Sequence, residues 1–251
     1  MTIKDYERVD DLQYKGLKLI QDPNNFCFGI DAVLLANYAK ASAGDKVVDL
    51  CTGSGVIPIL MSGKTAATEL IGAEIHGPTA EMASRSVELN DLTGRVKILN
   101  RDIRKLPEVL PKGSVDVVTC NPPYMIADHG LHGEDEAKNI ARFELECTLE
   151  DVADTAAALL KTGGMFYMIH RPFRLTEIMV TLSSHKLEPK RMRLVYPYVD
   201  KEPTMVLIEA KRDAKSRITV EKPLIVYESP GVYTQDLLSF YGADDAEVRD
   251  E

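Results

Sequence analysis

The sequence of 251 residues has no long hydrophobic run. No stretch approaches the roughly 18 consecutive apolar residues that a membrane-spanning helix needs. The first residues, Met1–Glu7, also contain no apolar segment of the kind found in signal peptides. We therefore expect a cytoplasmic protein with no membrane association.

Cysteine is scarce and scattered, at Cys27, Cys51, Cys120 and Cys147. No two of them form a CxxC pair, and their spacing does not match a metal site. Reduced thiols in a cytosolic protein are the simplest interpretation. Cys51 and Cys120 lie at predicted strand ends, but neither has an obvious basic partner, which favours small buried hydrophobic residues over a catalytic thiol.

An excess of positive charge is also absent, since the formal net charge is −9. Strong non-specific binding of nucleic acid needs clustered Lys and Arg, so this charge argues against that class of protein. Residues 186–193 and 211–217 are nevertheless locally basic. They form either one patch or solvated strand ends and loops, and both interpretations fit the sequence.

The remaining composition, 45% hydrophobic and 27% charged residues, is ordinary for a globular protein with one large core. Helix and strand patterns alternate without repeats or low-complexity linkers, which predicts an α/β fold with a mainly parallel sheet. We expect one domain over residues 1–213, and an extension over 214–251 that packs on it or trails from it. The predicted strands are 46–50, 70–75, 96–99, 115–120 and 165–169, followed by a closing hairpin of 193–196 and 205–210.

The predicted helices are 29–38 at the sheet edge, 78–90, a third that begins at the capping box of residues 148–151 and stops at Gly163-Gly164, and 175–184. Residues 216–242 are expected to add a strand and a short helix.

The tetrapeptide Asn121-Pro122-Pro123-Tyr124 follows the β-branched run 115–120, so it lies where open α/β sheets bind ligands. Two successive prolines make the backbone stiff and extended. The Asn121 oxygen, the Pro122 carbonyl and the Tyr124 ring, gathered at one place, suit a planar –NH2 group. The pattern predicts methyl transfer to a nitrogen that is conjugated with a ring or a carbonyl. The alternative is a rigid turn with a half-buried tyrosine.

A glycine-containing turn follows the first predicted strand, at residues 49–56. Gly53 and Gly55 allow a tight turn and close approach of the backbone to a ligand. Cys51 stands where a strict GxGxxG motif has its first glycine. The turn is therefore either a plain structural turn or part of a cofactor site.

Acidic residues at three successive strand ends favour the cofactor site. Asp49 can bind an ammonium group, directly or through backbone and water, and Glu74 can bind a ribose diol. Asp102 can accept a hydrogen bond from an adenine amine, with Ile103 beside the ring. Each acid alone is more often a solvated strand end, but the three together predict a nucleoside ligand.

Asp-x-Cys-x-Gly-x-Gly, the two later acids and Asn-Pro-Pro-Tyr together resemble class I S-adenosylmethionine-dependent methyltransferases, in the branch that acts on amino nitrogens. Residues 25–36 and 48–60 are similar to the bacterial valine-tRNA adenine-N6 methyltransferases, which modify the adenine just 3′ of the anticodon, position 37. The similarity covers roughly residues 10–212.

The resemblance implies a Rossmann-like, seven-stranded, mostly parallel sheet whose last strand is antiparallel, with S-adenosylmethionine across its carboxyl edge. It implies a tRNA substrate, no metal and a monomer. The catalytic residues would be Asn121, Pro122 and Tyr124. The cofactor would be held by Asp49, Thr52, Gly53 and Gly55 at the methionine end, Glu74 at the ribose, Asp102 and Ile103 at the adenine, and Phe28, Asp31 and Asn121 near the sulfonium.

Two further features have open interpretations. Residues 127–136 contain His129 and His132 with four acids and two glycines, which suggests a metal site or a mobile lid. We favour the lid, because methyl transfer from a sulfonium needs no metal. His170-Arg171 ends the fifth predicted strand, where the arginine either contacts phosphate or is solvated or paired with a carboxylate.

Three rival functions are less well supported. A protein glutamine N5-methyltransferase of the release-factor type would carry a helical domain before the cofactor turn, and only about 45 residues precede Asp49 here. A DNA adenine methyltransferase would usually have a separate target-recognition domain. A non-catalytic RNA-binding methyltransferase fold suits the basic segments, but the expected cofactor and acceptor positions are all occupied.

Overall fold

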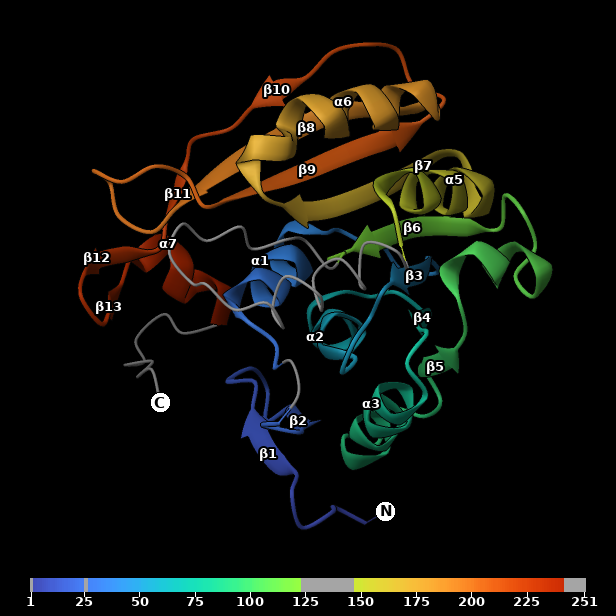
Figure 1. Ribbon diagram of the computed structural model, residues 1–251, viewed down its shortest axis with the longest axis vertical. Helices are drawn as coiled ribbons and strands as arrows, with labels where there is room; N and C mark the ends of the chain where they lie inside the picture. Colours follow the sequence, from blue (N-terminus) through green and yellow to red (C-terminus); the bar gives the residue numbers. More distant parts are fainter. Residues whose placement is uncertain (1, 25–26, 123–146, 242–251) are drawn as a thin grey trace, which may run out of the picture.

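The computed structural model describes residues 2–24, 27–122 and 147–241, and Figure 1 shows a central sheet with helices on both sides. The strand order is β10-β8-β9-β7-β6-β3-β4-β5, and β11 also pairs with β8. Only β9 runs antiparallel to its neighbours β7 and β8. The predicted mostly parallel sheet with an antiparallel last strand is confirmed. Its seven long strands are β3 (Lys46–Leu50), β4 (Glu69–Glu74), β5 (Val96–Asn100), β6 (Val115–Cys120), β7 (Leu160–His170), β8 (Leu187–Tyr196) and β9 (Met205–Arg212).

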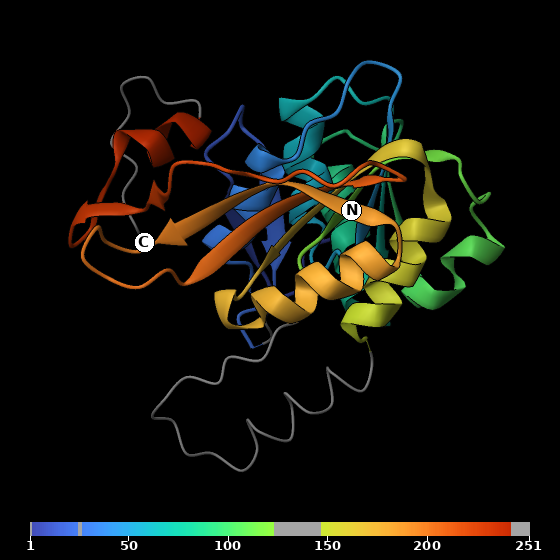
Figure 2. The ribbon, with the colours of Figure 1, turned by 90° about the horizontal axis from the view of Figure 1, so that it is seen from above.

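Helices cover both faces of this sheet, as Figure 2 shows from above. One face is covered by α1 (Ile30–Tyr38), α2 (Val56–Lys64) and α3 (Gly77–Leu89), and the other by α5 (Leu149–Leu159) and α6 (Leu175–Ser184). Short 3-10 turns follow β5 and β7, as η1 (Ile103–Glu108) and η2 (Pro172–Arg174). None of the described helices is long and apolar enough to cross a membrane.

Alternation along the central strands builds two hydrophobic cores. Val47 and Val117 belong to the core under α1–α3, whereas Val48 and Val118 belong to the core under α5 and α6. Successive side chains of a strand point to opposite faces, so a strand covered on both faces must be apolar throughout. Burying each such side chain contributes about 1.5–3 kcal/mol, which explains why β3 and β6 stand out in the sequence.

Two helix predictions need correction, and one is confirmed. The capping box is present, since Thr148 and Asp151 each bond to the other's backbone amide. The helix it opens ends at Leu159, not at Gly163-Gly164; these glycines lie inside β7, where Gly163 has a φ of +80° beside a register shift with β6. The helix predicted at the sheet edge, α1, packs on β7, which is an interior strand.

The N-terminal residues form a hairpin that the sequence did not predict, β1 (Arg8–Asp11) with β2 (Lys18–Gln21). Just before it, the nearly buried Glu7 forms an ion pair with Arg85 of α3 at 2.5 Å, which ties this hairpin to the body of the protein.

The C-terminal residues extend the sheet and cover its β8 end (Figure 1). β10 (Thr219–Val220) and β11 (Leu224–Ile225) run parallel to β8. A small hairpin of β12 (Tyr227–Ser229) and β13 (Val232–Tyr233) follows, and then α7 (Gln235–Leu238) and η3 (Ser239–Tyr241). Leu224, Val226 and Leu237 join the core under α1.

Candidate active site

The carboxyl ends of β3, β4, β5 and β6 are aligned at one edge of the sheet. Leu50 pairs with both Ala73 and Cys120, and Glu74 pairs with Asn100. The residues that follow these positions therefore meet at the same edge, as expected for ligand sites in open parallel sheets. This alignment brings the predicted cofactor turn, Glu74, Asp102 and Asn121 together.

Asp49 is the buried anchor of the edge, with 1% of its surface exposed. In β3 it lies between Gly72 of β4 and Thr119 of β6. One carboxyl oxygen accepts from the Thr119 hydroxyl and the other from the Thr52 hydroxyl, each at 2.6 Å. Burial raises the pKa of Asp49 to about 7, against the two hydroxyl bonds, which lower it. Asp49 thus fixes the turn through Thr52. Thr119 holds the Asp49 carboxylate in place, a role that the sequence pattern did not reveal.

Gly72 makes room for Thr52. A Cβ at Gly72 would lie 2.7 Å from Thr52 Oγ1 and 2.8 Å from Thr52 Cγ2. Only glycine allows the Thr52 side chain to pack over β4 and still reach Asp49. No sequence signal marked this glycine, because the requirement comes from a neighbouring strand.

The turn itself has the strained backbone that glycine permits. Gly53 and Gly55 have φ values of +55° and +83°, and Cys51, a non-glycine, has +57°. Nothing lies within 4 Å of the position of a Gly53 Cβ, so the turn is open on that side. Glu74 fixes it from β4, because its Oε2 accepts from the Gly53 amide at 2.9 Å and its Oε1 from the His76 amide at 2.8 Å.

Asp102 and Ile103 lie at the end of β5, as predicted, but in different surroundings. Asp102 caps η1 and forms an ion pair with Arg104 at 2.5 Å, which holds the pKa of its carboxyl below the usual value. Ile103 is 5% exposed and packs in the core under α5. Their proposed contacts with adenine remain predictions.

Asn121 lies one residue beyond β6 and is joined to the start of α1. Its Nδ2 donates to Asp31 Oδ2 at 3.2 Å. Its Oδ1 is buried and has no hydrogen-bond partner among the described residues. Phe28 comes from the same N-terminal side, where its amide donates to the buried Gln21 of β2 at 2.8 Å. Tyr124, His129 and His132 lie outside the described residues.

Three of the four scattered cysteines gather beside the cofactor turn. The Sγ atoms of Cys51 and Cys147 are 3.8 Å apart, and Cys120 also bonds to Cys51. The hydrogen bond with Cys120 raises the pKa of Cys51, and the bond with Cys51 together with burial raises that of Cys147. These three thiols are free. Cys120 is buried, whereas Cys51 and Cys147 are half-buried and pack against the core under α5 and α6. The prediction of a small buried residue therefore holds for Cys120 but not for Cys51.

The two basic segments meet, but away from this edge. Lys190 Nζ donates to the Lys215 carbonyl at 2.8 Å, and Leu187, the first residue of β8, pairs with Arg212, the last residue of the antiparallel β9. They therefore gather toward the amino edge of the sheet, opposite Asn121.

His170, at the carboxyl edge, is 1% exposed, and burial lowers its pKa to about 4, so it is a neutral interior residue.

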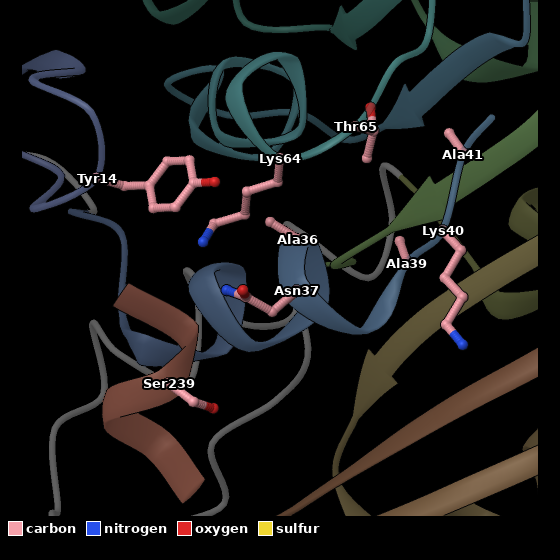
Figure 3. Close-up of a pocket in the computed structure, with 9 residues that line it drawn as sticks. All are labelled: Tyr14, Ala36, Asn37, Ala39, Lys40, Ala41, Lys64, Thr65 and Ser239. Carbon is pink, nitrogen blue, oxygen red and sulfur yellow. The ribbon is translucent and has the colours of Figure 1, made fainter. Parts of the chain in front are cut away.

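A separate cavity of about 390 Å³ lies beside α1, between Tyr14, Lys64 and Ser239 (Figure 3). It is lined by the last turn of α1 and by Lys64, the last residue of α2, whereas Asp31 is in the first turn of α1. The Lys64 amine lies 3.5 Å from the centre of the Tyr14 ring, and burial lowers the pKa of Lys64 to about 8. The cavity is thus distinct from the strand-end site.

A mostly parallel sheet with a glycine turn after β3, an acid at the end of β4 and an Asn-Pro corner after β6 defines a class I methyltransferase. The chain belongs to the methyltransferase small domain family, whose model matches residues 17–184. It is 26% identical over 236 residues to the tRNA1(Val) (adenine(37)-N6)-methyltransferase of Porphyromonas gingivalis, which covers 91% of this chain and 92% of that protein. It is 24% identical over 228 residues to the enzyme of the same name from Flavobacterium johnsoniae, which covers 90% and 95%.

Solved structures show the same fold. A predicted O-methyltransferase from Agrobacterium tumefaciens superposes with a TM-score of 0.67 at 24% identity, over 88% of this chain and all of that one. TYW2 of M. jannaschii, in complex with AdoMet, superposes with a TM-score of 0.57 at 15% identity, over 84% and 88%. The protein is therefore an S-adenosylmethionine-dependent methyltransferase. The open side of Gly53 and the acid at the end of β4 fit this cofactor.

Proposed function

We propose that the protein methylates the exocyclic N6 amine of an adenine in tRNA, and that this adenine is extrahelical and lies at position 37 of a valine tRNA. The observation that carries the proposal is the buried, unpartnered Oδ1 of Asn121 at the carboxyl edge, among the residues that the structure describes. A buried acceptor without a donor costs about 1–3 kcal/mol, so a ligand that brings an N–H group to it is favoured. The names of the full-length relatives support adenine N6 in tRNA as the source of that group.

The cofactor is proposed to lie along the ends of β3, β4 and β5. The open side of Gly53, with Thr52 and Gly55, faces its methionine end above the buried Asp49. Glu74 would bind the ribose, and Asp102 with Ile103 would contact the adenine. Phe28 and Asp31 flank the corner where the two reactants meet. When bound, S-adenosylmethionine supplies an electrophilic methyl group on a sulfonium.

The residues of the corner would act by orienting the amine. An adenine amine is a weak nucleophile because its lone pair is delocalised into the ring. Asn121 Oδ1 and the Pro122 carbonyl can each accept one N–H, which leaves the lone pair directed at the methyl group. Positive charge develops on this nitrogen during transfer, and the two fixed oxygens stabilise it. Pro122 has no N–H that would compete, and Tyr124 would stack on the base, which an extrahelical adenine requires.

The test is methyl transfer to a defined RNA. The protein is incubated with labelled S-adenosylmethionine and an unmodified valine-tRNA transcript, and the nucleosides are analysed by mass spectrometry. We expect N6-methyladenosine, and no label in a matched transcript that carries guanine at position 37. Label at another adenine would overturn the position. In a parallel incubation with a release-factor-like protein in place of RNA, label in a protein glutamine, with none in the RNA, would favour the release-factor type of activity.

A further inference from the structure

The side-chain amide of Asn121 must point in one direction for the proposed function, and this requirement leads to Asp31. The side-chain amide of Asn is nearly symmetric in shape, so a half-turn about its last bond exchanges the oxygen and the nitrogen without changing the space that the group fills. The proposed chemistry needs Oδ1 toward the acceptor amine. Something in the protein must therefore hold Nδ2 on the other side.

Asp31 occupies that other side. Its Oδ2 accepts from Asn121 Nδ2 at 3.2 Å. With the amide reversed, Asn121 Oδ1 would face a carboxylate oxygen at that distance, an arrangement of two acceptors without a proton between them. The carboxylate thus selects the orientation in which Oδ1 is directed away from it, where it is buried and without a partner among the described residues.

The Asp31 carboxylate is itself held in place. Its Oδ1 accepts from the Ala32 amide at 2.9 Å, in the first turn of α1, where backbone dipoles favour negative charge. A Cβ at Gly29 would lie only 2.9 Å from the same Oδ1, so the glycine leaves room for it. Each carboxylate oxygen therefore has its own donor: Oδ1 the Ala32 amide, and Oδ2 the Asn121 amide.

We propose that Asp31 is a positioning residue, which sets the amide of Asn121 with its oxygen toward the acceptor nitrogen. This inference rests on the proposed role of Asn121 and changes the assignment of Asp31 from a cofactor contact to a residue that acts through Asn121. In this hydrogen bond, the residue at position 31 must accept and the residue at position 121 must donate.

A reciprocal exchange of the two residues tests the pair. In Asp31→Asn, the new amide oxygen keeps the Ala32 amide, and its NH2 group faces Asn121 and reverses it. In Asn121→Asp, two carboxylates meet at hydrogen-bond distance. We expect each single variant to lower kcat at least tenfold. In the double variant D31N/N121D, the amide introduced at position 31 donates to one oxygen of the carboxylate introduced at position 121. The other oxygen is left for the amine, so kcat recovers at least tenfold over each single variant.

The double variant has the same composition and net charge as the wild type, so charge alone does not explain a recovery. Thermal midpoints and the Kd for S-adenosylhomocysteine are measured for all four proteins, and we expect the Kd values to agree within about threefold. A double variant no more active than the single variants would overturn the proposal. A normal kcat in the Asp31→Asn variant would also overturn it. If that variant raised the Kd for S-adenosylhomocysteine and left kcat unchanged, Asp31 would be a cofactor contact and not a positioning residue.

The kcat values of the variants are compared with the wild type on whichever acceptor, RNA or protein, the wild type methylates. If the wild type methylates a protein amide and no RNA, the proposed function fails, but the exchange still tests the role of Asp31.

Discussion

The two halves of the site differ in how their polar atoms are satisfied. In the cofactor turn, both carboxyl oxygens of Asp49 and both of Glu74 already accept hydrogen bonds from the protein. At the acceptor corner, Asn121 Oδ1 is buried without a partner among the described residues. The carboxylates of the turn are satisfied within the protein, whereas the corner keeps one acceptor oxygen that no described residue satisfies. Sites commonly depart from full satisfaction where they act on a substrate.

Removal of the unpartnered Asn121 oxygen is expected to have the largest effect on activity. Asn121→Ala is expected to lower kcat by about 10²–10³, as for the loss of one preorganised polar contact. The Kd for the cofactor should change little, because the cofactor turn is intact. The control is Asn37→Ala, which removes an amide that bonds to Val33 in the same helix α1. Equal kcat for the Asn121 variant and the control would remove Asn121 from the mechanism.

The opposite result is expected at the cofactor half. Glu74→Ala removes the carboxylate that fixes Gly53, and hydrogen bonds to charged groups contribute about 1.5–3 kcal/mol. We expect the Kd for S-adenosylhomocysteine to rise about 10- to 100-fold. Glu69→Ala, at the other end of β4, removes an ion pair with Lys46 and serves as the control. A normal Kd in the Glu74 variant would exclude Glu74 from the cofactor site.

The buried carboxyl of Asp49 predicts a pH effect on stability. Its folded pKa, about 7, lies above the ordinary value of 3.8, so the folded state binds the proton more tightly than the unfolded state does. This group's contribution is fully present below about pH 4 and is lost as the pH rises toward 7. Relative to Asp49→Asn, the wild type should lose about 2 kcal/mol of unfolding free energy between pH 5 and 7.5. Urea denaturation at the two pH values measures this loss.

Asp116→Asn is the control with the opposite sign. Although burial alone would raise the pKa of Asp116, the ion pair with Lys161 and the amide of Lys46 hold it below the ordinary value. Its contribution is therefore present above pH 4 and is lost only as the pH falls through the folded pKa. The interpretation of Asp49 as a buried acid would be contradicted if the difference in unfolding free energy between the wild type and Asp49→Asn did not change from pH 5 to 7.5.

The smallest expected effect concerns the fit between β4 and the turn. Gly72→Ala places a methyl group against Thr52 and Ile98, and overpacking of this kind costs about 1–2 kcal/mol. We expect a lower thermal midpoint together with a higher Kd for the cofactor, since Thr52 is displaced from Asp49. Gly94→Ala, where nothing lies within 4 Å, should change neither quantity. Equal behaviour of the two variants would show that the close approach at Gly72 is unimportant.

Much of the fold could be predicted because the central strands carry their own signal. The apolar runs of β3 and β6 are buried on both faces, and the boundaries predicted for α6 agree with the structure. The end of α5 was misplaced because Gly163-Gly164, a common helix stop, here lies in β7. The β1–β2 hairpin was missed, since it depends on contacts with α3, distant in sequence.

The sequence by itself determined the strand-end acids, the glycine turn and the Asn-Pro corner, because their chemistry and their places after apolar runs are local properties. Only the tertiary structure decided that Thr119 and Gly72 flank Asp49, that three cysteines meet, and that Asp31 bonds to Asn121, 90 positions away. These pairings follow from strand register and from the packing of α1. The burial that leaves one amide oxygen without a partner among the described residues exists only once the chain has folded.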